Sequence, residues 1–144
     1  MDTRFSSAIH LLILVSEAET PMTSDQIAVS VGTNGSYIRK LTGLLRRSGI
    51  LESRQGVSGF RLLIPPGELS LFQIYEAVTE EESVHLFDLH QNPNDECIVG
   101  RHIQPMLKDV FRDVETQAEQ RLKSTTLADC MNTMRAEIER GGDK

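Results

Sequence analysis

The sequence has few of the residues that build disulfide frameworks or aromatic cores. Its 144 residues include two cysteines and no tryptophan, and only 5% of them are aromatic. With so few aromatic side chains, the core must consist mainly of Leu, Ile, Val and Ala. Cys97 and Cys130 lie far apart, so they indicate no disulfide framework, and they cannot by themselves form a four-thiolate metal site.

Long apolar runs are also missing. The longest run near the N-terminus, Leu11–Val15, is far shorter than the roughly 20 residues that a membrane span needs. No small-residue cleavage site of a signal peptide follows it. We therefore expect a cytoplasmic protein without membrane contact, and the 39% hydrophobic and 25% charged residues are typical of a globular chain.

Charge is distributed unevenly along the chain, whose formal net charge is −6. Residues 20–66 contain six Lys/Arg and two acidic residues, a net charge of +4. Residues 67–144 contain eight Lys/Arg and sixteen acidic residues, a net charge of −8. A basic segment in an otherwise acidic chain is the distribution expected of a surface that binds nucleic acid.

The basic segment has the pattern of two short helices joined by a tight turn. Thr23 or Ser24 is a candidate N-cap, and with Thr23 the glutamine three residues later completes a capping box. Gly32 then ends the first helix. Asn34 and Ser36 both offer N-cap oxygens for the second helix, whose apolar residues recur with helical spacing.

Two short β-prone runs, residues 50–53 and 60–63, follow these helices around a glycine-containing turn. Two helices followed by such a hairpin describe a winged helix-turn-helix, which presents one helix to the DNA major groove and a hairpin beside it. Arg54 and Arg61 flank the tip, where arginines can contact phosphates or enter a minor groove. An exposed hairpin whose arginines merely keep its edge soluble is the alternative.

The second helix is expected to act as the recognition helix. Its early polar residues should face outward while Ile38 and Leu41 pack inward. A solvated helix start with ordinary caps would have the same pattern. The predicted DNA-contacting residues are Ser24, Asn34, Ser36, Tyr37, Arg39, Lys40, Arg46, Arg54, Gly56 and Arg61.

Helical spacing outside this segment predicts a first helix over residues 4–18 and another that Ser70 caps. Periodicity is lost over residues 83–99. A long helix is predicted from Gly100, with Pro105 in its first turn, where a missing N–H costs little. A last helix, capped by Thr125 or Thr126, should reach about residue 139.

The long helix carries an apolar stripe, and the chain has no second helix of similar length. The stripe therefore predicts pairing with a second copy in a homodimer, with docking on the first helix as the alternative. The predicted fold class is mainly α with a small β-hairpin. A winged helix-turn-helix head over residues 1–80 precedes a loop and a helical dimerisation region over residues 81–144.

These motifs resemble the Rrf2 family of bacterial winged-helix transcription regulators over nearly the whole chain. The similar segments are Tyr37–Leu41, Leu44–Arg54, Gly56–Leu62 and Pro65–Val78. The resemblance implies dimers that cross through the long helix, each head binding half of a palindromic DNA site, and a repressor is the expected activity. The family's Gly-Gly pair in the wing is Ser58–Gly59 here, with an additional residue before Gly56.

Cluster-binding members of this family carry three cysteines in the loop before the long helix, whereas this chain has only Cys97 there. Residues 92–100 resemble a cluster-free branch, so we expect no iron–sulfur cluster and no other cofactor or metal. A mixed site of Cys97 with His85, His90 and His102 is the alternative. Cys97 is also a candidate redox sensor, since a following helix N-terminus lowers the pKa of a thiol.

Two other classes of function compete with a DNA-binding regulator. A winged-helix module that binds another protein, without DNA, would fit the acidic C-terminal half. An enzyme has least support, because the sequence has no Ser/His/Asp order, phosphate loop or metal-ligand cluster in a plausible context. No catalytic residue is therefore predicted, and a small-molecule effector is left open.

Overall fold

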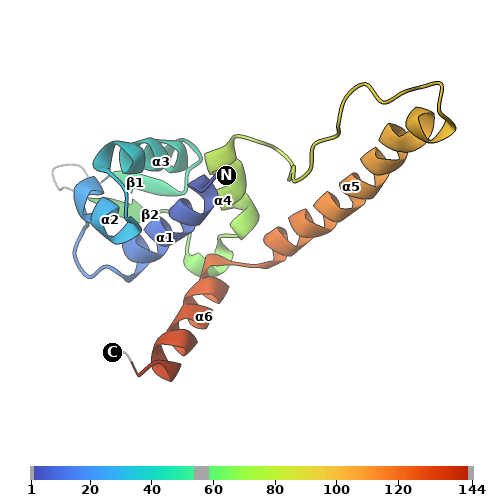
Figure 1. The fold of residues 1–144 in the computed structure, drawn as a ribbon. Coiled ribbons are helices and arrows are strands. Elements are labelled where there is room, and N and C mark those ends of the chain that lie inside the picture. Colours follow the sequence, from blue (N-terminus) through green and yellow to red (C-terminus); the bar gives the residue numbers. More distant parts are fainter. Residues whose placement is uncertain (1, 54–58, 143–144) are drawn as a thin grey trace. The chain divides into compact units, whose positions relative to one another are not determined.

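The computed structural model describes residues 2–53 and 59–142, which are mainly helical (Figure 1). The elements are α1 (Arg4–Glu17), α2 (Ser24–Val31), α3 (Gly35–Arg47), β1 (Leu51–Ser53), β2 (Phe60–Leu62), the 3₁₀ helix η1 (Pro66–Glu68), α4 (Leu71–Thr79), α5 (Ile98–Ser124) and α6 (Leu127–Arg140). β1 and β2 pair antiparallel, with Glu52 opposite Arg61. The predicted fold class, helical with one small hairpin, is confirmed.

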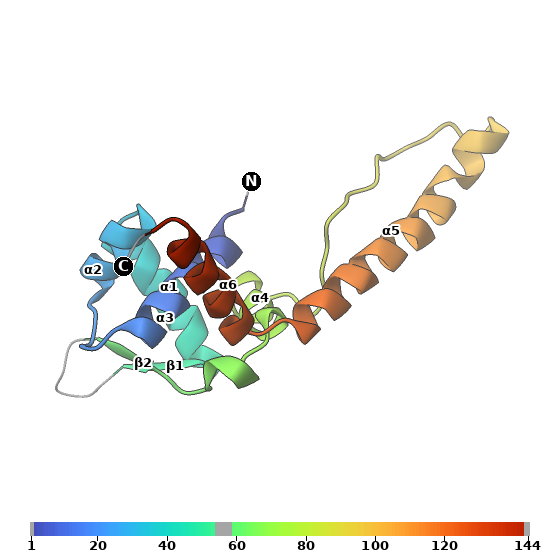
Figure 2. The same ribbon diagram turned by 90° about the horizontal axis from the view of Figure 1, so that it is seen from below.

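Contacts divide the chain into two compact units. The head unit extends to Glu81 and resumes at Leu122, and the second unit is Glu82–Arg121. The head unit therefore includes α6, which packs against α1 and η1 (Figure 2). The division at residue 80 into two domains stays a prediction.

The core of the head unit is aliphatic, as the scarcity of aromatic residues predicts. Each fully buried Leu or Ile side chain contributes roughly 1.5–3 kcal/mol by leaving water. α1 to α4, the hairpin and α6 all contribute to it. Its largest fully buried side chains are Leu11, Leu12, Ile27, Ile38, Leu41, Leu45, Ile50, Leu51, Leu69, Ile74, Leu127 and Val78.

The helix starts in the head unit are fixed by local side-chain caps. Thr23 and Gln26 form the predicted capping box, in which the Gln26 N–H donates to Thr23 Oγ1 at 3.2 Å. Ser70 and Thr126 form equivalent boxes at α4 and α6. Gly32 ends α2 in the left-handed region at φ +85°, so this stop is also confirmed.

The starts of α4 and α6 are joined by a short antiparallel bridge between Ser70 and Thr126. The Leu71 N–H donates to the Thr125 carbonyl, and the Leu127 N–H donates to the Leu69 carbonyl, each at 2.8 Å. Leu127 itself is fully buried. α6 is therefore attached to the head unit by backbone hydrogen bonds as well as by apolar packing.

The prediction for Pro105 was wrong. α5 begins at Ile98, so Pro105 lies in the helix interior, where it removes the hydrogen bond to the Arg101 carbonyl. Both residues are exposed, so water can satisfy that carbonyl. Gly100 lies inside α5 rather than at its start, and a Cβ there would collide with the Asn94 carbonyl, so only glycine fits.

Among the described residues, no helix combines the length and the apolar character that crossing a bilayer requires.

Candidate nucleic-acid interface

α3 has two chemically distinct faces. Its inner face buries Ile38, Leu41, Thr42, Leu44 and Leu45 in or beside the head core. The one polar member of this set, Thr42, donates its hydroxyl to the Arg39 carbonyl at 3.1 Å. The helix is thus held firmly from one side, and its other side is open to solvent.

The outer face of α3 is small or basic. Ser36, Lys40, Gly43 and Arg47 recur at spacings of four, three and four residues, which places them along one line of the helix. α3 contains no acidic residue. A Cβ on Gly43 would meet nothing within 4 Å. Because glycine has no side chain, nothing projects from the helix surface between Lys40 and Arg47. The outer face can therefore lie close to an anionic surface.

Arg39 connects α3 to the start of α2. Its guanidinium lies 3.6 Å from the Asp25 carboxylate and 3.3 Å from Ser36 Oγ. A Cβ on Gly35 would collide with the Asp25 carboxylate, so the glycine makes room for this pair. Both side chains are largely exposed, and such a surface pair contributes little stability. Arg39 is oriented by the pair but remains able to exchange Asp25 for another anion.

A hollow of about 340 Å³ brings two of the predicted residues together. Ser24 at the first turn of α2 and Arg39 on α3 line it, beside Ser53 and Gly59 at the base of the wing. Backbone N–H groups at a helix start favour an anion, as does the arginine. The structure thus places the start of α2, α3 and the wing base on one surface.

Among the residues that the structure describes, the wing has one arginine, Arg61. Arg61 forms an ion pair with Glu52, its partner in the β1–β2 ladder, so this acid offsets part of its charge. The other two predicted wing residues, Arg54 and Gly56, lie outside the described residues. Gly59 has φ +127°, and a Cβ there would collide with Pro21, so only glycine fits where the wing meets the α1–α2 connection.

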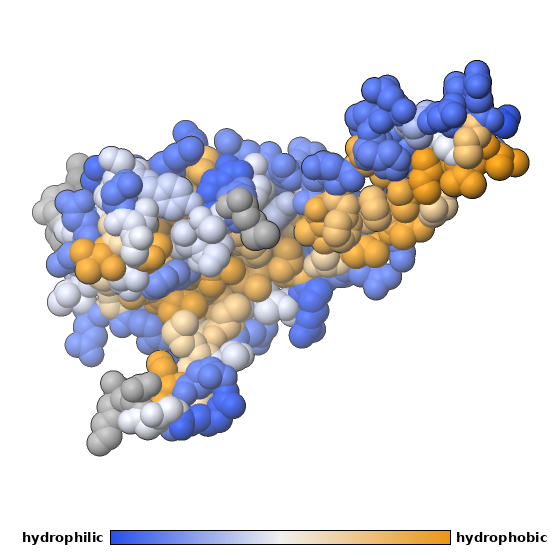
Figure 3. Space-filling view, viewed as in Figure 1, coloured by the Kyte–Doolittle hydropathy of each residue, from blue (hydrophilic) through white to orange (hydrophobic). Residues whose placement is uncertain are grey.

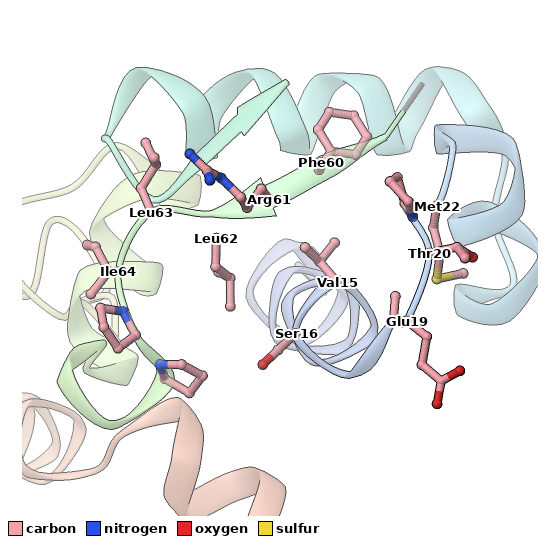
Figure 4. A pocket seen from close by; sticks show the side chains of 14 residues that line it. Val15, Ser16, Glu19, Thr20, Met22, Phe60, Arg61, Leu62, Leu63 and Ile64 are labelled. Carbon is pink, nitrogen blue, oxygen red and sulfur yellow. The ribbon is translucent and has the colours of Figure 1, made fainter. Parts of the chain in front are cut away.

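A second hollow of about 370 Å³ lies under the wing (Figure 4). Val15 from the end of α1 and Leu62 from β2 extend into it, whereas the Glu19 carboxylate points away. Val15 and Leu62 are partly buried against the head core. All three residues of β2, Phe60–Leu62, line this hollow together with the end of α1.

The remaining predicted residues have mixed placements. Asn34 caps α3 by accepting the Tyr37 N–H at 2.9 Å, which settles the choice between Asn34 and Ser36. Tyr37 does not face fully outward as expected, because its side chain packs partly on the core. Arg46 is exposed in the last turn, where a cation also complements the helix dipole.

Sequence reasoning missed three residues on this surface. Arg47 lies on the outer line of α3, although only Arg46 was predicted. Gly43 could have been found as a glycine inside a helical pattern. No pattern in the sequence could identify Asp25 as the partner of Arg39, because that pair depends on how α2 packs against α3.

Cys97 lies exposed at the start of α5. The backbone N–H groups of Gly100 and Val99 lower the pKa of its thiol, as the sequence predicts for a helix start. Within residues 2–53 and 59–142, no three His, Cys, Asp or Glu side chains are arranged to hold a metal ion. One thiol in this loop does not fit a cluster that ordinarily needs four protein ligands.

Comparisons with known proteins identify a matching family and similar proteins. The family described as "Rrf2: Iron-dependent Transcriptional regulator" matches residues 1–133. The "Putative HTH-type transcriptional regulator YwnA" of Bacillus subtilis is 41% identical over 132 residues, which are 92% of this chain and 97% of that protein.

Two solved structures share the fold. The "Crystal structure of a putative DNA binding protein" has a TM-score of 0.71 and 38% identity, covering 89% of this chain and 98% of that one. CymR, the global cysteine regulator of B. subtilis, has a TM-score of 0.67 over 90% of this chain and 94% of its own. Its identity of 20% supports the fold alone.

Proposed function

The chain belongs to the Rrf2 family of transcriptional regulators and is not an enzyme; from this we propose that it is a homodimeric repressor that binds a palindromic operator. The observation that carries the proposal is the outer face of α3. It is exposed, free of acidic residues and attached to the head through a buried apolar face. This is the form of a helix that enters the major groove.

Each part of the surface has a distinct role in the proposal. Ser36 and Lys40, near the start of α3, reach base edges, where recognition helices make most of their specific contacts. Arg46 and Arg47 bind phosphates farther along the helix. Arg39 exchanges its Asp25 partner for a phosphate beside the start of α2.

The homodimer forms through an apolar stripe on α5, which Figure 3 displays along one side of this helix. Its exposed members are Ile98, Val99, Met106, Val110 and Val114. Exposed apolar side chains at helical spacing are costly in water and are covered in a helix pair. A two-fold dimer presents two α3 helices, which accounts for a palindromic site.

A dimer on DNA near a promoter excludes other proteins from the same sequence, and repression follows from that exclusion. DNA binding also assigns the protein to the cytoplasm. No cofactor takes part in this proposal, since a single loop thiol does not suit a cluster. A colourless absorption spectrum of anaerobically purified protein would agree with that prediction, and visible cluster bands would contradict it.

The direct test is fluorescence anisotropy with DNA from upstream of the protein's own gene, measured over a range of salt concentrations. The double variant Lys40→Gln with Arg47→Gln should bind more weakly and show a shallower salt dependence, by about 0.9 in the log–log slope for each lost phosphate contact. Arg140→Gln on α6 removes a cation from another part of the head unit and should bind like the wild type.

Two results would contradict the proposal. One is no detectable binding to this DNA or to any sequence enriched from a random pool at low salt. The other is binding that the double variant leaves unchanged. Copurification of a protein partner in place of DNA would favour the alternative interaction module.

A further inference from the structure

The loop before α5 and the helix itself line an open cavity of about 700 Å³, which belongs entirely to the unit Glu82–Arg121. Sites for small molecules usually measure about 300–1,000 Å³. The loop contributes His85, Phe87 and Leu89, and the helix contributes Lys108, Phe111 and Arg112. The cavity thus has an apolar part and a charged part.

The loop is held on the helix by specific contacts. The Glu115 carboxylate, which is 16% exposed, accepts the N–H groups of Leu86 at 2.6 Å and Phe87 at 3.2 Å. The Phe87 and Phe111 rings pack with their centroids 5.0 Å apart. The walls of the cavity are therefore built by hydrogen bonds and ring packing between the loop and α5.

The lining contains two cations, Lys108 and Arg112, and two carboxylates, Asp88 and Glu115. Both carboxylates already have partners: Glu115 accepts from the loop backbone and lies 3.7 Å from His85 Nδ1, and Asp88 lies 2.8 Å from His85 Nε2. Lys108 and Arg112 lie one turn apart on α5, and neither forms an ion pair with another residue in the described part of the chain. The cavity therefore presents two adjacent cations beside two aromatic rings.

The cavity and the apolar stripe use different sides of α5. A helix turns by about 100° per residue, so Lys108 and Arg112, each two positions from Val110, lie about 160° around the helix from it. A second copy that covers the stripe at Val110 and Val114 would leave the cavity open. The cavity is thus not explained by the dimer proposed above.

We propose that this cavity binds a small organic acid with an aromatic or branched apolar body. Arg112 and Lys108 hold the carboxylate, since an arginine can bind it through two parallel hydrogen bonds and a lysine adds a second charge. The apolar body packs against Phe87 and Phe111. The recognised feature is an anionic group at one end of a compact apolar molecule.

The test uses the full-length protein and the fluorescent probe anilinonaphthalene sulfonate, which combines an aromatic body with an anionic group. Bound probe is displaced with phenylbutyrate and, separately, with phenylbutanol, which has the same body without the charge. The acid should displace the probe at a concentration more than about tenfold lower than the alcohol, a difference of about 1.4 kcal/mol.

The double variant Lys108→Gln with Arg112→Gln should abolish that difference, with circular dichroism confirming that it folds. Arg101→Gln removes a cation from α5 outside the cavity lining and should keep the difference. The proposal is overturned if the wild type binds no probe, if acid and alcohol compete equally, or if the double variant retains the preference. The titration contains no DNA, so its outcome is separate from that of operator binding.

Discussion

At the scale of single residues, Gly43 is expected to lower the stability of the head unit and to favour operator binding. Glycine inside a helix costs roughly 0.5–1 kcal/mol relative to alanine, and a Cβ at Gly43 would meet no atom within 4 Å. Gly43→Ala should therefore raise the free energy of unfolding by about that amount. It should also weaken operator binding, because the methyl group occupies space between Lys40 and Arg47.

Urea unfolding and anisotropy on the same protein measure both effects. Gly32→Ala is the matched control: it adds the same methyl group, but at φ +85°, so it should lower the unfolding free energy by roughly 1 kcal/mol. Equal DNA affinity of the wild type and Gly43→Ala would mean that DNA does not approach α3 along this line.

The surroundings of the two cysteines shift the pKa of their thiols in opposite directions. Backbone N–H groups lower the pKa of the exposed Cys97 thiol, whereas burial, helped by Asp129, raises the pKa of Cys130. More Cys97 is therefore thiolate near neutral pH, and it should react first with iodoacetamide. Mass spectrometry of the alkylated protein checks this order, and faster labelling of Cys130 would contradict it.

If Cys97 is the redox sensor, oxidant should release DNA from the wild type and from Cys130→Ser but not from Cys97→Ser. An equal response of all three proteins would remove Cys97 from that role.

At the scale of elements, Asp25 limits the positive charge of the α2–α3 surface. Asp25→Asn removes the carboxylate that pairs with Arg39 at 3.6 Å. DNA affinity should therefore rise across all sequences by a few fold, with a steeper salt dependence. Glu17→Gln, which removes an acidic partner of Arg135 at the end of α1, is the control and should change neither quantity. Unchanged binding by Asp25→Asn would show that the pair does not limit DNA affinity, and weaker binding would show that Arg39 needs its acidic partner.

The elements that the sequence predicted well depend on neighbours in the chain. Thr23, Ser70 and Thr126 could be identified as caps because each bonds to a backbone group three residues away. The pairing of Arg39 with Asp25 and the packing of Tyr37 could not be predicted, because they depend on how separate helices meet. Gly100 was wrongly predicted to start the long helix. The close approach of the Asn94 carbonyl, which requires glycine there, cannot be predicted from helical spacing.

At the scale of the whole molecule, DNA binding should depend on the apolar stripe of α5. Val110→Glu places a charge within the stripe, so the protein should become monomeric in analytical ultracentrifugation. Its affinity for a palindromic operator should fall by roughly a hundredfold, because two linked heads bind far more tightly than one. Its affinity for a single half-site should not change.

Gln120→Glu adds the same negative charge to α5 away from the stripe, so it should stay dimeric and keep its operator affinity. A wild-type protein that sediments as a monomer would contradict the proposed dimer, although the α3 surface could still bind DNA. A monomeric Val110→Glu variant with undiminished operator affinity would show that one head suffices.

The bridge between Ser70 and Thr126 has a consequence for a cleaved chain. A protease cut between residues 88 and 97 would leave the N-terminal part of the head and α6 on separate peptides. The amides of Leu71 and Leu127, with the buried Leu127 side chain, should still hold these peptides together. The nicked protein should elute as one species on a sizing column and separate only in denaturant, much as a split protein reassembles from its fragments.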